Sequence, residues 1–224
     1  MKKKNFASIL DAALLEPETT MKQLEELCEN AKKYGYAAVG VMPSRVKTAV
    51  ELLRGSNVKV LVAVGFPFGM TTPSVKAHEA AEAIDNGASE VDMVINIGKM
   101  KDGDYTAVLE DMKAVVETTK AKGDIVVKAI LETGYLTDDE IVKACQLAEE
   151  AGMDYVKTST GFGEGYATVP ILELMRKSVS PKVGIKASGK VRTYEKALDF
   201  TNVGCTRLGC SAKSAIAIVQ GGMD

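Results

Sequence analysis

Short apolar runs alternate along the chain with longer segments of helical periodicity. The short runs are rich in β-branched residues and do not alternate strictly with polar residues, which is typical of parallel strands covered on their outer face. We predict eight such strands, over residues 8–12, 37–41, 58–64, 90–96, 124–131, 154–158, 182–187 and 205–209.

The segments between these strands have the features of amphipathic helices. Within residues 20–33, Leu24, Leu27 and Ala31 recur with a period of ~3.6 residues. Several segments end in a glycine, the residue that helix C-termini favour because it adopts the left-handed conformation easily. These glycines are Gly87, Gly123 and Gly152.

Eight strand–helix units in succession predict an α/β protein, a (β/α)8 TIM barrel. An open doubly wound sheet is the alternative that the same pattern allows. The 224 residues are somewhat fewer than the ~250 typical of the barrel, so we expect short loops. No linker or change of composition interrupts the chain, and we predict a single domain over residues 1–224.

Composition limits the classes of function. The 28 basic and 30 acidic residues give a net charge of −2, which argues against binding of nucleic acid or a membrane surface through bulk charge. No run is long and apolar enough to span a bilayer. The four cysteines form no CxxC pair and are interpreted as reduced thiols, so we expect a soluble, cytoplasmic protein.

The chain has one histidine, His78, in a stretch that we expect to form a helix surface. A histidine-based catalytic triad and a metal site with several histidines therefore lack their residues. Acid–base chemistry would have to use lysine, carboxylate, tyrosine, cysteine or water.

Three lysines stand at equal intervals of 29 residues, each in or after an apolar run: Lys128, Lys157 and Lys186. A buried ammonium group needs a partner, a lowered pKa or a reactive role. The C-terminal ends of barrel strands line the active site, where we expect the lysines beside Asp11 and Asp92. Neighbouring cations can make an amine nucleophilic at neutral pH. Structural ion pairs in the barrel wall are the other interpretation of each lysine, and the pattern alone leaves both open.

Glycine-containing loops follow predicted strands six, seven and eight. Glycine lets the backbone approach a ligand closely, and N–H groups at helix starts favour anions. One such loop is more often a plain turn, but loops after strands seven and eight frequently hold phosphate in this fold. The residues expected to bind a phosphorylated substrate are Asp11, Gly161, Gly189, Lys190, Gly209 and Ser211.

Two lysine-centred motifs are specific: Val-Lys-Thr-Ser-Thr-Gly-Phe at 156–162 and Gly-Ile-Lys-Ala-Ser-Gly at 184–189. Together with the stretches at 64–67, 90–98, 130–133 and 206–209, they make the chain resemble the deoxyribose-phosphate aldolase family over nearly its whole length.

The resemblance implies a class I aldolase, a lyase that needs no metal or cofactor. It would reversibly cleave 2-deoxy-D-ribose 5-phosphate to acetaldehyde and glyceraldehyde 3-phosphate, as part of deoxyribonucleotide catabolism. By motif position, Lys157 would form a Schiff base, Lys186 would keep the Lys157 amine deprotonated, and Asp92 would exchange protons with a water. Lys128 is expected to form an ion pair inside the barrel, with Asp92 or Glu132.

The chain departs from the family pattern near the expected pocket. Ala12 and Ala13 replace His-Thr, Gly40 replaces a cysteine, and Lys190 replaces the second glycine of a Gly-Gly pair. These changes predict an altered or larger sugar-phosphate pocket, because Ala13 cannot bond a substrate hydroxyl. Two alternatives remain: an aldolase of the same mechanism that acts on another sugar phosphate, and a homologue that binds a sugar phosphate without catalysis. The sequence leaves the oligomeric state open, with a homodimer as the assembly considered.

Overall fold

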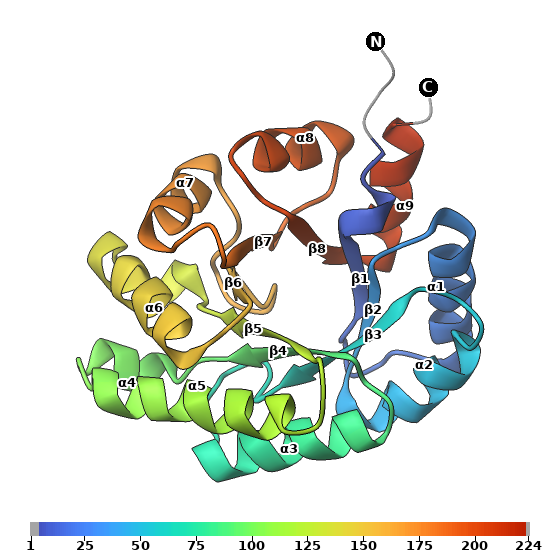
Figure 1. Ribbon diagram of the computed structural model, residues 1–224. Helices are drawn as coiled ribbons and strands as arrows, with labels where there is room; N and C mark the ends of the chain where they lie inside the picture. The colour runs from blue at the N-terminus through green and yellow to red at the C-terminus, as the bar shows by residue number, and fades with distance from the viewer. Residues whose placement is uncertain (1–4, 223–224) are drawn as a thin grey trace.

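The computed structural model describes residues 5–222; residues 1–4 and 223–224, which the single-domain prediction includes, lie outside the described part. Eight parallel strands close into a barrel in the order β1 to β8, and the helices surround it (Figure 1). The closed ring confirms the predicted (β/α)8 barrel and excludes the open doubly wound sheet.

Each predicted strand is present. The strands are β1 Leu10–Leu14, β2 Ala38–Val41, β3 Lys59–Val64, β4 Glu90–Val94, β5 Val126–Ile130, β6 Tyr155–Lys157, β7 Gly184–Ser188 and β8 Arg207–Ser211. All of them except β4 begin one or two residues later than predicted, and the 3-10 turn Ala7–Ile9 occupies the residues before β1. Asp11, expected at the C-terminal end of its strand, is therefore the second residue of β1.

The helices lie in the predicted intervals. They are α1 Met21–Tyr34, α2 Val46–Leu52, α3 Pro73–Asp85, α4 Ile97–Lys101, α5 Tyr105–Lys120, α6 Asp138–Ala151, α7 Val169–Ser178, α8 Tyr194–Asn202 and α9 Ala212–Gly221, with further 3-10 turns at Pro43–Arg45 and Thr133–Tyr135. Side-chain capping fixes their starts: Thr20 and Thr137 form capping boxes at α1 and α6. Within residues 5–222, no helix is both long and apolar enough to cross a membrane.

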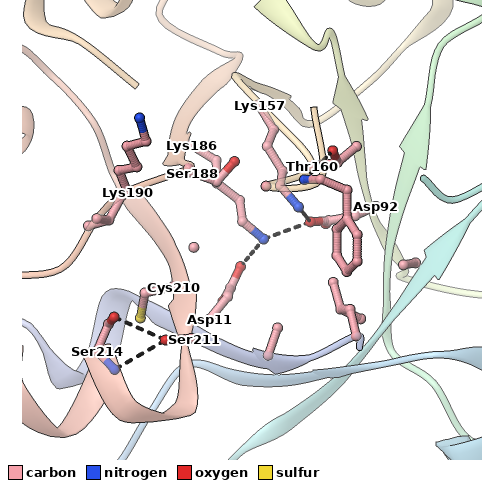
Figure 2. A pocket seen from close by; sticks show the side chains of 18 of the residues that line it. Asp11, Asp92, Lys157, Thr160, Lys186, Ser188, Lys190, Cys210, Ser211 and Ser214 are labelled. Carbon is pink, nitrogen blue, oxygen red and sulfur yellow. Dashed lines mark hydrogen bonds and ion pairs between the residues drawn. The ribbon is translucent and has the colours of Figure 1, made fainter. Parts of the chain in front are cut away.

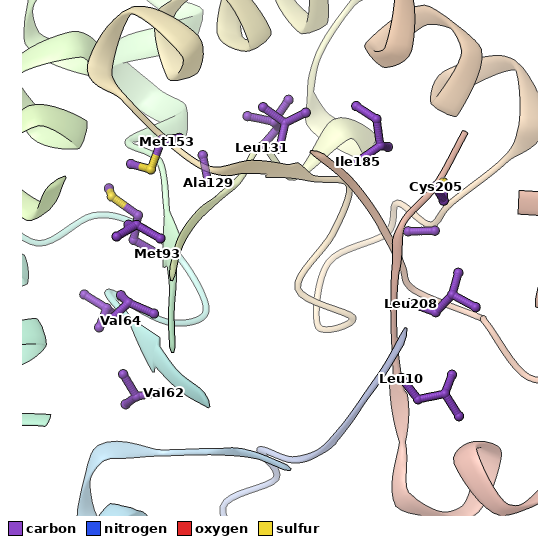
Figure 3. Close-up of a cluster of buried hydrophobic side chains, with 14 of the residues drawn as sticks. Leu10, Val62, Val64, Met93, Ala129, Leu131, Met153, Ile185, Cys205 and Leu208 are labelled. Carbon is purple, nitrogen blue, oxygen red and sulfur yellow. The ribbon is translucent and has the colours of Figure 1, made fainter. Parts of the chain in front are cut away.

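Along each strand, successive side chains alternate between the apolar core outside the barrel and the charged site inside it. Leu10, Met93 and Ile185 point outward into an apolar layer between the strands and the helices (Figure 3). Their chain neighbours Asp11 and Lys186 are buried too. Because successive strand side chains point to opposite faces, these charged groups lie on the inner face of the barrel.

A buried ion pair joins the helical layer to the barrel. The Lys76 ammonium on α3 lies 2.5 Å from an Asp111 carboxylate oxygen on α5 and donates to the Val94 carbonyl at the end of β4, at 2.8 Å. Both side chains are buried. The pair thereby links two helices to the strand that carries Asp92.

We expect Asp111→Leu to lower the free energy of unfolding by about 3–5 kcal/mol, because it leaves the Lys76 ammonium buried without a counter-ion. The double variant Lys76→Met, Asp111→Leu should recover most of that loss. Lys122→Met, which removes an exposed partner of Asp85, should cost less than about 1 kcal/mol. Urea denaturation followed by circular dichroism measures all three. A double variant as unstable as the single one would contradict this account of the pair.

Candidate active site

A cavity of about 250 Å³ opens beside the loops that follow the last strands of the barrel (Figure 2). It brings together every site residue predicted from the sequence. Its lining includes Asp11, Asp92, Lys157, Gly161, Lys186, Gly189, Lys190, Gly209 and Ser211.

Asp92 on β4 lines the cavity and contacts three lysines. Its Oδ2 atom accepts hydrogen bonds from the amines of Lys157, at 2.8 Å, and Lys186, at 2.7 Å. Its Oδ1 atom lies 3.0 Å from the Lys128 amine. Strand register explains the convergence, because β5, β6 and β7 follow β4 in the ring and pair Asp92 with Lys128 and Lys157 with Lys186. One buried carboxylate thus faces three ammonium groups.

A second set of ion pairs lies around this centre. Lys186 also contacts Asp11, at 2.5 Å. Lys128 donates to Glu90 at 2.6 Å, and Arg207 on β8 contacts Glu90 at 2.7 Å and also donates to Asp11. The sequence analysis missed Glu90 and Arg207; the signal was available, since both lie at inward positions of predicted strands, within motifs shared with the family.

The prediction that Lys128 forms an ion pair inside the barrel, with Asp92 or Glu132, is confirmed by its pair with Asp92. The second carboxylate that Lys128 contacts is Glu90, not Glu132. Glu132 lies beyond the end of β5, and its carboxylate accepts hydrogen bonds from Thr160 instead. The chain turns there, so the two-residue period that would direct Glu132 into the barrel no longer applies.

The ion pairs link seven side chains, which we call the buried charge cluster: Asp11, Glu90, Asp92, Lys128, Lys157, Lys186 and Arg207. Fully ionised, the cluster carries four positive and three negative charges. Loss of one proton from a lysine would balance it.

Lys157 is the lysine best placed to lose that proton. Burial lowers its pKa to about 8, and the neighbouring cations Lys186 and Lys128 act in the same direction, while Asp92 opposes them. The Asp92 carboxyl is also buried, yet the three lysines hold its pKa well below the ordinary value. The site therefore combines a permanent carboxylate with an amine that is partly neutral near pH 7.

The rim of the cavity is formed by the loops after β7 and β8. Gly189 has φ 83, and a Cβ there would lie 2.9 Å from the Tyr166 backbone. Lys190 also has a positive φ, 56, and its amine lies 3.9 Å from the centre of the Tyr166 ring. Ser211 caps α9 by accepting from the Ser214 N–H. A cationic side chain, glycine-containing loops and a helix start thus adjoin one another at the rim, a combination suited to an anionic group.

The two lysine motifs are also joined by hydroxyl groups that the sequence analysis did not single out. Thr158 donates to the Ser188 carbonyl at 2.8 Å, and the Ser188 hydroxyl donates to the Ser159 carbonyl at 2.5 Å. These bonds tie the ends of β6 and β7 together. The spacing between Lys157 and Lys186 is therefore fixed by bonds beyond the strand ladder.

The residues at which the chain departs from the family pattern do not all lie at the cavity. Ala13 lines the cavity, and Gly40 lies beside it, since a Cβ on Gly40 would approach the Ala13 Cβ to 2.9 Å. Ala12, expected near the pocket, instead points outward into the apolar core. Adjacent strand residues face opposite sides, so only one of the two alanines can border the cavity.

Within residues 5–222, no three or more histidine, cysteine or carboxylate side chains are arranged to hold a metal ion. His78 is exposed on α3, as expected. The chemistry of the site rests on lysines and carboxylates.

Comparison with known proteins agrees with this geometry. The family described as DeoC/LacD family aldolase matches residues 3–222. The deoxyribose-phosphate aldolase of Streptococcus suis (strain 98HAH33) is 54% identical over 212 residues, which cover 95% of this chain and 94% of that protein. The enzyme of the same name from Lysinibacillus sphaericus (strain C3-41) is 52% identical over 217 residues, covering 97% and 96%.

Solved structures show the same likeness. One from Coccidioides immitis superposes with a TM-score of 0.93 at 38% identity, covering 99% of this chain and 88% of the other. The deoxyribose phosphate aldolase of Aeropyrum pernix, described as a unique tetramer, gives a TM-score of 0.90 at 27% identity, covering 98% and 91%. The protein is therefore a lyase, and the chain belongs to the DeoC/LacD family of aldolases.

Proposed function

We propose that this protein reversibly cleaves 2-deoxy-D-ribose 5-phosphate to acetaldehyde and glyceraldehyde 3-phosphate through a Schiff base on Lys157. The observation that carries the proposal is the Lys157 amine itself. It borders the cavity, lies 2.8 Å from Asp92 and shares that carboxylate with Lys186. The relatives named deoxyribose-phosphate aldolase support the choice of substrate.

The contacts of the three lysines favour Lys157 as the nucleophile. Lys128 is bound to two carboxylates and does not line the cavity, and Lys186 is also bound to two. Lys157 contacts one carboxylate, and 7% of its side chain is exposed. With a pKa of about 8, about a tenth of its amine is neutral at pH 7.

The reaction follows from an amine and a nearby carboxylate. The Lys157 nitrogen adds to the substrate aldehyde, and the loss of water gives an iminium ion. The iminium then withdraws electrons from the neighbouring carbon–carbon bond, which breaks as the hydroxyl on the far carbon loses its proton. Glyceraldehyde 3-phosphate leaves, the enamine that remains takes up a proton on carbon, and water releases acetaldehyde from Lys157. Asp92, acting with a water, would accept and return these protons.

The substrate phosphate would bind at the rim. Lys190 supplies a positive charge, Gly189 and Gly209 leave space for the backbone to approach, and Ser211 stands at the start of α9. Asp11 was predicted to bind substrate as well. Its two oxygens already contact Lys186 and Arg207, so the geometry favours a role in holding Lys186.

An aldolase of the same mechanism acting on another sugar phosphate is the second candidate. The observation that favours it is Ala13, whose methyl group borders the cavity where the family has a threonine. A wall without that hydroxyl discriminates less between substrates with and without a hydroxyl group.

We further infer that the protein acts in deoxyribonucleotide catabolism in the cytoplasm, in keeping with its bacterial relatives. A homodimer is the assembly we propose. The tetramer described for the Aeropyrum pernix enzyme indicates that larger assemblies occur among its structural relatives.

Borohydride trapping tests the Schiff base. We expect incubation with acetaldehyde and sodium borohydride, followed by digestion and mass spectrometry, to find a reduced two-carbon adduct on Lys157. Lys157→Met should form none in the cavity, and the exposed-lysine variant Lys47→Met should label as the unaltered protein does. The absence of an adduct on Lys157 with any small carbonyl donor would contradict the proposal. An adduct with hydroxyacetone or dihydroxyacetone but not with acetaldehyde would favour the second candidate.

The pH dependence of the same labelling tests the role of Lys186. The neutral amine is the nucleophile, so the rate of trapping should rise with pH through the Lys157 pKa of about 8 and then level off. Lys186→Met removes a cation that lowers this pKa, so its midpoint should move to higher pH. Below the midpoint the rate should fall roughly tenfold for each unit of that shift. A midpoint equal to that of the unaltered protein would leave Lys186 only a structural role.

A further inference from the structure

Glu132 has a backbone conformation that glutamate rarely adopts. With φ 54 and ψ 59 it lies in the left-handed region at the start of the 3-10 turn Thr133–Tyr135. A side chain disfavours this region, whereas glycine enters it without steric cost. The shape of the turn therefore does not explain a glutamate, and the contacts of its side chain must.

The Glu132 carboxylate is buried, with 1% of the residue exposed, and it faces the loop after β6. Its Oε2 atom accepts from the Thr160 N–H at 3.1 Å and from the Thr160 hydroxyl. That hydroxyl oxygen in turn accepts from the Phe162 N–H at 3.0 Å. A chain of hydrogen bonds thus runs from the end of β5 to a segment that begins three residues after Lys157.

Close backbone packing supports this chain of bonds. A Cβ on Gly163 would lie 3.1 Å from the Glu132 carboxyl carbon. A Cβ on Gly134 would lie 2.3 Å from the Cα of Gly165. The loop at 160–165 therefore lies directly on the turn that Glu132 begins, with no room for side chains between the two backbones.

The same loop forms one wall of the cavity. Thr160 and Phe162 both line it beside Lys157, and Figure 2 shows Thr160 close to Asp92 and Lys157. The Phe162 ring meets Phe66, from the loop after β3, edge to face with 5.3 Å between ring centres. The loop after β6 thereby reaches across to the loop after β3.

We propose that Glu132 is a positioning residue for the aldolase reaction: its carboxyl group holds residues 160–163 as the cavity wall beside Lys157. This inference rests on the proposed function, because it takes Lys157 as the reacting group. Glu132 itself does not line the cavity. It acts through Thr160, whose fixed position keeps Phe162 against Phe66 and limits the freedom of a substrate bound to Lys157.

The variant Glu132→Gly distinguishes a positioning role of the Glu132 carboxyl group from a role in the backbone of the turn alone. Glycine suits the backbone conformation at this position, so the variant should fold, but it lacks the carboxyl group. We expect kcat/KM for deoxyribose 5-phosphate to fall by roughly tenfold to a hundredfold, since small displacements beside a reacting group have effects of that size. Amide hydrogen exchange at Thr160 and Phe162 should become faster. Glu132→Gln keeps one oxygen acceptor and should retain most of the activity and the protection.

Two further variants complete the test. Thr160→Val removes the hydroxyl that links Glu132 to Phe162, so it should reproduce part of the loss and the faster exchange at Phe162. Glu164→Ala alters an exposed carboxylate of the same loop and should match the unaltered protein. Turnover by Glu132→Gly within twofold of the unaltered protein, with unchanged exchange at Thr160, would overturn the proposal.

The exchange measurement needs no turnover, so it distinguishes the two possible failures. Protection of Thr160 that depends on Glu132, in a protein that forms no adduct on Lys157, would support the positioning contact and contradict the proposed function. An adduct on Lys157 together with rapid exchange at Thr160 in the unaltered protein would support the proposed function and contradict the positioning contact.

Discussion

The site depends on one buried carboxylate that is shared by three amines. Asp92 contacts Lys128, Lys157 and Lys186, which come from three successive strands of the ring. Lys186 on β7 lies three strands away from Asp92 on β4, and their side chains meet because the sheet curves into a closed ring with both residues facing inward. The closed ring is therefore a condition of the chemistry. An unpaired ammonium group at these positions would be costly to bury, and Asp92 provides the partner that each lysine needs.

Charge balance within the buried charge cluster explains why the three lysines differ in how firmly each holds its proton. Four cations face three carboxylates, so the fully protonated cluster holds one surplus positive charge in a poorly solvated interior. Lys128 and Lys186 each contact two carboxylates, whereas Lys157 contacts one. Lys157 and Lys186 both border the cavity, and Lys157 is the more exposed of the two. The lysine with the fewest anionic partners and the best access to substrate is therefore the one whose proton is held least firmly. The cluster supplies the reactivity, and the Glu132 contact to Thr160 orders the wall beside it.

Periodicity in the sequence predicted eight strand–helix units, and that count favoured the barrel over the open sheet. The strand ends and the glycine-containing loops predicted the residues around the cavity, and the 29-residue spacing of the lysines placed them at equivalent positions of adjacent units. Which inward residues contact each other across the ring was not predictable, because the local sequence pattern does not show the stagger between strands. Arg207 and Glu90, which are 117 residues apart, were therefore not paired, although both lie at inward positions of predicted strands. Glu132, the alternative partner named for Lys128, contacts Thr160 instead, since the chain leaves the strand geometry just before it.

The pKa of the Lys157 amine tests the central claim most directly. Lysine labelled with 13C and 15N at the side-chain terminus gives NMR signals that can be followed with pH, and the signal missing from Lys157→Met identifies Lys157. The account predicts a pKa of about 8 for the unaltered protein. It also predicts that the Lys157 pKa rises in Lys128→Met, in which the cluster has lost its surplus cation. A Lys157 pKa near the ordinary 10.5, or one that Lys128→Met leaves unchanged, would contradict it.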